Sequence, residues 1–128
     1  MTFREALDKH LQAIQHRDLA ALTDTLPAGD IVLITADGRL VRDPHEFRDL
    51  HEGWFDSRSW TLDVRPVDLR ETPDLGVAVL QLRYRDTSPD GRTIDETSYL
   101  TLIFARDGGR WFMVHDQNTP VRARPPAE

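Results

Sequence analysis

The 128-residue sequence contains no cysteine, which excludes disulfide bonds, thiolate metal ligands and cysteine nucleophiles. It has a single lysine, Lys9, so arginine carries nearly all of the positive charge. The formal net charge is −6, which argues against nucleic acid as a partner because phosphate binding draws on clustered Lys and Arg. No apolar run approaches the roughly 20 residues that a transmembrane helix needs. The N-terminal residues contain no apolar signal core, and we therefore expect a cytoplasmic protein.

The residues that are present indicate a globular chain. Hydrophobic residues make up 39% of the sequence and charged residues 30%, a balance that permits a packed core and is not typical of disorder. The length suits one domain. We expect a single domain over residues 1–121, followed by a flexible Pro-rich tail at 122–128.

The N-terminal part of the chain has the pattern of three helices. Thr2 and Glu5 form a capping box at the start of an amphipathic helix over residues 3–16. Asp18 can cap a second, short helix, and Asp43 can cap a third. The three helices are therefore predicted from their own capping residues and apolar spacing.

From residue 59 onward the hydrophobic period changes from 3.6 to 2, which predicts β-strands. The turn sequences "TSPDGRT" and "RDGG" separate the later strands. The predicted strands cover residues 59–71, 76–87, 94–106 and 110–119. Helices followed by antiparallel strands indicate an α+β fold, and a long sheet can curl around the helices and enclose a cavity.

Two segments carry a resemblance to a known family. "DIVLITADGRLVRDPHEF" leads into the third helix, and "DGGRWFMVHDQNT" ends the sheet. With this element order, the chain resembles the NTF2-like (cystatin-like) superfamily, and within it the SnoaL-like polyketide cyclases and the association (hub) domain of calcium/calmodulin-dependent protein kinase II. Trp111, Val114 and His115 match the hub's last strand, whereas Gln117 and Thr119 stand where the hub has His and Ser.

The resemblance implies a cone in which three N-terminal helices pack on a curved antiparallel sheet. It also implies a small-molecule-binding protein of the SnoaL-like type, in which an isomerase, cyclase or dehydratase would use general acid–base chemistry in the cone pocket. The alternative is a non-catalytic ligand-binding or assembly domain like the hub. A buried base in a closed pocket would favour the enzyme, and an open pocket without a perturbed carboxylate would favour the binder.

Strand alternation assigns polar side chains to one face of the expected sheet. Asp116 is a candidate base and Tyr99 a candidate hydrogen-bond donor to a carbonyl, so these two are the predicted catalytic pair. Arg83 can grip a carboxylate or an enolate oxygen, and the resemblance places it where the hub has a pocket arginine. The alternative is that Arg83 lies on a solvated sheet face. The full set expected to converge is Gln81, Arg83, Tyr99, Thr101, Asp116 and Asn118.

Other candidate residues carry weaker signals. Trp54 and Trp60 could line a ligand pocket or pack in the core, and the sequence does not choose between these roles. His45 and His51 are six residues apart, so they do not share a helix face as a zinc motif requires. We therefore expect no metal and no cofactor, and a small organic ligand as the partner.

The other sheet face is expected to be strongly apolar. If the helices cover the face with Tyr99 and Val114, the opposite face is left without a cover. A patch of that size is rarely left wet on a monomer, and we expect a homodimer formed through it. The residues assigned to the bare face are Leu80, Leu82, Tyr84, Leu100, Leu102, Phe104, Trp111 and Met113.

Overall fold

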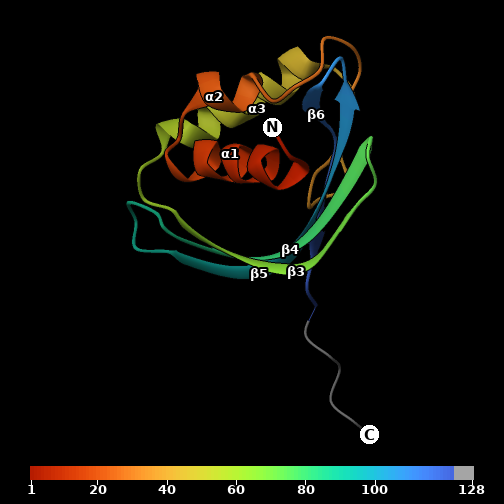
Figure 1. Cartoon of the computed structure of the whole chain (residues 1–128). Helices are drawn as coiled ribbons and strands as arrows, with labels where there is room; N and C mark the ends of the chain where they lie inside the picture. Colours follow the sequence, from red (N-terminus) through yellow and green to blue (C-terminus); the bar gives the residue numbers. More distant parts are fainter. Residues whose placement is uncertain (123–128) are drawn as a thin grey trace, which may run out of the picture.

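The structure is a computed structural model that describes residues 1–122. Three helices lie on one side of a curved sheet (Figure 1): α1 (Phe3–Gln15), α2 (Leu19–Thr23) and α3 (Pro44–Asp56). Within the described residues, no helix is long and apolar enough to cross a membrane. Apart from Arg122, the predicted flexible tail lies outside the described residues.

All six strands form one sheet in the order β2-β1-β6-β5-β4-β3. β1 runs parallel to β6, and every other neighbouring pair is antiparallel. The α+β cone expected from the sequence is confirmed, with helix and strand bounds close to those predicted. The strands are β1 (Val32–Ile34), β2 (Leu40–Val41), β3 (Thr61–Glu71), β4 (Leu75–Thr87), β5 (Thr93–Asp107) and β6 (Arg110–Pro120).

The predicted capping residues begin the helices. The Glu5 amide donates to Thr2 Oγ1 over 3.1 Å, and the Thr2 amide donates to Glu5 Oε1 over 3.2 Å, so both halves of the capping box are present. The Asp43 side chain accepts from the His45 amide at the start of α3. These bonds satisfy amides that have no partner within the helix.

The helices cover the sheet face that the sequence analysis left bare. Phe3 of α1 packs against Phe104 and Trp111, each with ring centroids 5.8 Å apart. It lies directly over Gly76, where a Cβ would clash with the Phe3 ring. The strongly apolar rows of the sheet therefore form the core inside one chain, and the assignment of the two faces from the sequence was reversed. The buried sheet residues of this face include Leu80, Leu82, Leu100, Leu102, Phe104 and Met113.

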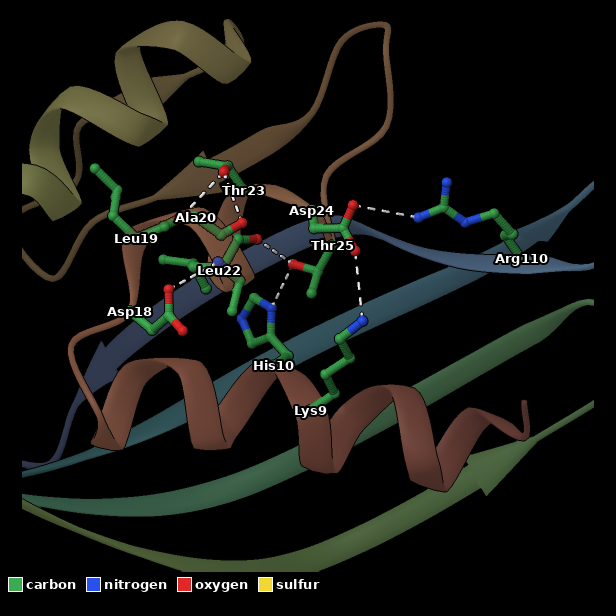
Figure 2. Close-up of polar contacts among 11 residues, drawn as sticks. Lys9, His10, Asp18, Leu19, Ala20, Leu22, Thr23, Asp24, Thr25 and Arg110 are labelled. Carbon is green, nitrogen blue, oxygen red and sulfur yellow. Dashed lines mark hydrogen bonds and ion pairs between the residues drawn. The ribbon is translucent and has the colours of Figure 1, made fainter.

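A polar contact inside the helix layer joins α1 to the segment after α2 (Figure 2). His10 is fully buried, and its Nδ1 donates to Thr25 Oγ1 over 2.9 Å, because that hydroxyl in turn donates to the Leu22 carbonyl over 2.6 Å. The Met113 amide donates to the Thr25 carbonyl, which ties the same segment to β6. Burial lowers the pKa of His10 to about 3, so the ring is neutral near neutral pH.

Removing the first cap should weaken α1 measurably. We expect Thr2→Ala to lower the free energy of unfolding by about 1 kcal/mol, because the Glu5 amide loses its acceptor. Urea denaturation followed by circular dichroism measures this difference. Gln12→Ala, an exposed change in the same helix, serves as the control and should stay within about 0.5 kcal/mol of the parent. Equal unfolding midpoints for Thr2→Ala and the control would contradict the role of the cap.

Candidate functional site

The pairing of β6 changes by one residue at Val114. Phe104 of β5 pairs with Met113, whereas Ile103 pairs with His115, so Val114 has no partner on β5. Side chains alternate between the two faces of a strand, and one extra residue therefore exchanges the faces of everything that follows. Met113 faces the helices before this bulge, and Asp116 faces them after it.

Asp116 lies on a central strand and is almost completely shielded from solvent. Its backbone pairs with Leu33 of β1 and Leu102 of β5. Its side chain is only 5% exposed, and Oδ1 has no hydrogen-bond partner within residues 1–122. Burial disfavours the ionised carboxylate and raises the pKa of Asp116 to about 7. A carboxyl group with this pKa can both accept and donate a proton near neutral pH.

Asp116 opens into a groove between α3, the β1–β2 turn and the helix-facing side of β4–β6. The groove consists of an inner cavity of about 310 Å³ and an outer cavity of about 700 Å³. Four residues line both cavities, so the two are continuous: Ala36, Trp54, Tyr84 and Asn118. Asp116 and His51 line the inner cavity and do not reach the outer one. This volume suits a small organic molecule.

Two stacked indoles form one wall of the groove. The rings of Trp54 and Trp60 lie 4.2 Å apart and nearly parallel, and Trp60 Nε1 donates to the Trp54 carbonyl. Trp60 is 2% exposed, and the Arg17 guanidinium covers its ring at 3.7 Å. Trp54 therefore faces the groove, while Trp60 lies behind it in the core. Of the pair, the structure thus places Trp60 in the core, and a ligand-binding role for Trp54 stays a prediction.

His51 is a groove residue that the sequence analysis did not select. Its Nδ1 donates to the Phe47 carbonyl over 2.8 Å, and its ring stacks on the Phe47 ring at 4.0 Å. Burial lowers the pKa of His51, so the neutral ring leaves Nε2 as an acceptor. A signal was present, because His51 is four residues after Phe47 and three before Trp54 on the buried stripe of α3.

Two further polar groups complete the groove. Ser98 Oγ donates to Asn118 Oδ1 over 3.2 Å, which leaves the Asn118 amide nitrogen available to a ligand. The Tyr84 hydroxyl donates to Asp86 over 3.3 Å, and burial raises the pKa of Tyr84. Tyr84, rather than the predicted Tyr99, is the tyrosine of the groove.

The structure separates the predicted site residues. It places Asp116, Asn118 and Trp54 in the groove. It places Gln81, Arg83, Tyr99 and Thr101 on the opposite, outer face of the sheet, where Tyr99 is 40% exposed. Arg83 donates two hydrogen bonds, of 3.1 and 2.9 Å, to Asp95 there. The expectation that all six polar side chains share one face was therefore wrong, because it assumed an unbroken alternation along β6 and covered the wrong face with helices.

The burial of Asp116 predicts a pH-dependent cost to stability. Its folded pKa of about 7 lies above the ordinary carboxyl value of 3.8, so the folded state binds more protons between these values and stability falls as pH rises through this window. Asp116→Asn removes the cost. We expect the variant to gain stability over the parent from pH 4 to 8, by at most about 4 kcal/mol. Denaturant titrations across this range measure the gain.

The exposed Asp74→Asn serves as the matched control, and its stability should follow that of the parent at every pH. If the stabilities of Asp116→Asn and the parent run parallel across the range, the carboxyl group does not titrate in the way its burial predicts.

Several solved structures share this architecture. The chain resembles a protein of the NTF2-like family from Streptomyces avermitilis, named as a candidate dehydratase, with 14% identity, 94% of each chain covered and a TM-score of 0.80. A ketosteroid isomerase-like protein from Erwinia carotovora atroseptica gives 13% identity, 94% of each chain and a TM-score of 0.77. The association domain of C. elegans CaMKII gives 15% identity, 91% of each chain and a TM-score of 0.69. The TM-scores establish a common fold, and at these identities the likeness shows the fold alone.

No curated protein matches the sequence. The family comparison matches the SnoaL-like domain over residues 4–121, nearly the whole described chain. The sheet and the groove fall within the matched residues, as do the helices apart from Phe3, the first residue of α1. The chain therefore belongs to the SnoaL-like domain family.

Proposed function

We propose that the groove binds a small, partly apolar organic molecule and that Asp116 exchanges a proton with it. The observation that supports this proposal is the unpartnered carboxyl oxygen of Asp116, which is buried at the deep end of a cavity. A buried carboxyl without a hydrogen bond is costly to maintain. Its presence in a ligand-sized groove favours a role in chemistry over a role in packing.

The proposed reaction is proton abstraction next to a carbonyl group. The ionised Asp116 carboxylate takes a proton from the carbon, and the electron pair of the broken C–H bond moves toward the carbonyl oxygen. The Asn118 amide nitrogen donates a hydrogen bond to the developing negative charge on that oxygen. Asp116 then returns the proton to another carbon, giving an isomer. His51 Nε2 offers a second acceptor for a proton of the ligand.

The names of two structural relatives support this class of reaction, but the shared fold does not assign a reaction to this chain. The fold occurs in the ketosteroid isomerase-like protein and the candidate dehydratase described above. It also occurs in a kinase association domain, so a non-catalytic binding or assembly role is the alternative. The rigid, water-shielded position of Asp116 favours acid–base chemistry, since a binding role alone does not require an unpaired carboxyl group.

We also propose that the chain forms a homodimer through the outer face of the sheet. The face first expected to pair is covered by the helices of the same chain, so the outer face takes its place. Val77 of β4 pairs with Ile103 of β5, and Val79 lies on the same face. Phe112 and Val114 of β6 extend this half-exposed apolar area, which a second copy could cover.

Proton exchange with a flat ketone tests the acid–base role. In D₂O, the chain should accelerate exchange of the α-protons of 2-tetralone, as followed by NMR. The rate should rise as pH increases to about 7, because the base must be ionised. Asp116→Asn should lower the rate by about a hundredfold or more.

The exposed Asp74→Asn change should leave this exchange rate unchanged. Binding of 2-tetralone without any acceleration by the parent would favour the non-catalytic alternative. If Asp116→Asn retained the full rate, another group would have to be the base.

Light scattering tests the dimer. At micromolar concentration we expect a mass of twice the 14.7 kDa of one chain. Val79→Arg places a charge in the apolar area and should give the monomer mass, while Val67→Arg on the exposed edge strand β3 should leave the dimer intact. Circular dichroism checks that both variants are folded. A monomer mass for the parent would overturn the dimer.

A further inference from the structure

The mouth of the groove is lined by carboxylates from two separate parts of the chain. Asp37 comes from the turn between β1 and β2, and Glu96 comes from the start of β5. Both line the outer cavity, together with Trp54 and Tyr84. Asp95 also borders this cavity, but its carboxylate pairs with Arg83 on the outer face of the sheet. Among the described residues, no Lys or Arg side chain lines either cavity of the groove.

The charge at the mouth depends on the partners of each carboxylate. Asp37 accepts a hydrogen bond from Thr35 Oγ1, which lowers the pKa of Asp37. The hydrogen bonds from Arg83 lower the pKa of Asp95. Because these bonds hold the Asp95 carboxylate against the Arg83 guanidinium, both groups lie on the outer face of the sheet and compensate each other there. Glu96 makes no ion pair within residues 1–122, so the mouth keeps an excess of negative charge.

The aromatic side chains at the same mouth also favour a cation. Trp54 and Tyr84 line both cavities, with ring centroids 6.2 Å apart. The face of an aromatic ring attracts a positive charge, and the attraction is stronger where water is partly excluded. Carboxylates and ring faces therefore act in the same direction at the mouth, and both disfavour an anion.

The deep end of the groove requires a different part of the ligand. Asp116 is nine-tenths buried or more, and its Oδ1 is a buried polar atom of the inner cavity that lacks a hydrogen bond. Leu33, Leu50 and Trp54 surround it with apolar surface. A flat apolar body with one polar atom fits this end.

We propose that the groove selects a cationic ligand: a flat apolar body that reaches toward Asp116, joined to a protonated amine held at the mouth by Glu96 and Asp37 against Trp54 and Tyr84. This inference rests on the proposed function, because it places the ligand in the same groove. It adds that the ligand carries a positive charge. It differs from the expectation that Arg83 grips a carboxylate, since Arg83 lies on the other side of the sheet.

Three probes with the same indole ring and different charges test this selection. Tryptamine is a cation, tryptophol is neutral and indole-3-acetate is an anion. Their dissociation constants for the full chain can be measured by NMR titration at neutral pH and low salt. We expect tryptamine to bind about tenfold more tightly than tryptophol, and indole-3-acetate to bind more weakly than both. The advantage of tryptamine should shrink as salt is added.

Variants locate the selection at the mouth. Glu96→Gln combined with Asp37→Asn should remove most of the advantage of tryptamine and leave the affinity for tryptophol unchanged. Asp107→Asn, an exposed change at the β5–β6 turn, is the matched control and should retain the full advantage. Equal loss of affinity for all three probes in the double variant would overturn the inference, because it would reflect a damaged groove.

The outcomes distinguish this inference from the proposed function. If tryptamine binds no more tightly than tryptophol, the charge selection is wrong while acid–base chemistry on a neutral ligand stands. If tryptamine is preferred but Asp116→Asn does not affect proton exchange, the selection stands and the catalytic role fails. If none of the probes binds at millimolar concentration, the charge selection is overturned, while the acid–base role is still decided by the exchange of 2-tetralone.

Discussion

The unpaired residue Val114 of β6 determines which side chains of that strand enter the groove. Before the bulge, Trp111 and Met113 of β6 face the helices and complete the apolar core. With unbroken alternation, His115 would follow them into the groove and Asp116 would point outward. The extra residue reverses this order, so the strand changes from apolar to polar on its covered face without leaving the sheet. The carboxyl group of Asp116 therefore lies on a rigid central strand.

The helix layer shields the carboxyl group of Asp116 from water. α3 supplies the Phe47–His51 stack and Trp54, which stacks on Trp60 of the segment between α3 and β3, and these rings close the groove above Asp116. α1 is held by Phe3 over Gly76 and by the buried His10–Thr25 hydrogen bond (Figure 2). Because these contacts exclude water, the carboxyl group loses most of its hydration and its pKa rises. The groove is thus preorganised by packing on elements that also form the core.

The two faces of the sheet carry charge in different ways. On the outer face, Arg83 pairs with Asp95 and Arg85 with Asp63, so cations and anions largely compensate one another. Such exposed pairs contribute little to stability, but they keep both guanidinium groups away from the groove. The helix-facing mouth keeps the charge of Glu96 and Asp37. Arg39 offsets part of the charge of Asp37, but Glu96 has no ion-pair partner within residues 1–122, and this excess of negative charge is the physical basis for the proposed selection.

Local patterns in the sequence were sufficient to predict the elements of the fold. Caps such as Thr2 and Asp43 act on amides within the next turn, and the change of hydrophobic period marks the strands, so these features depend only on neighbours in sequence. The residues of the groove were predicted only in part. Tyr84 and Tyr99 both fit alternating strands, and which of them faces the helices depends on which sheet face the helices cover. The inward position of Asp116 depends on the register of β6 against β5, and its raised pKa depends on burial by α3. The covered sheet face, the register of β6 and the pKa of Asp116 are decided by tertiary packing. The free energy of covering one face and the cost of a bulge both come from contacts between segments that are far apart in the chain.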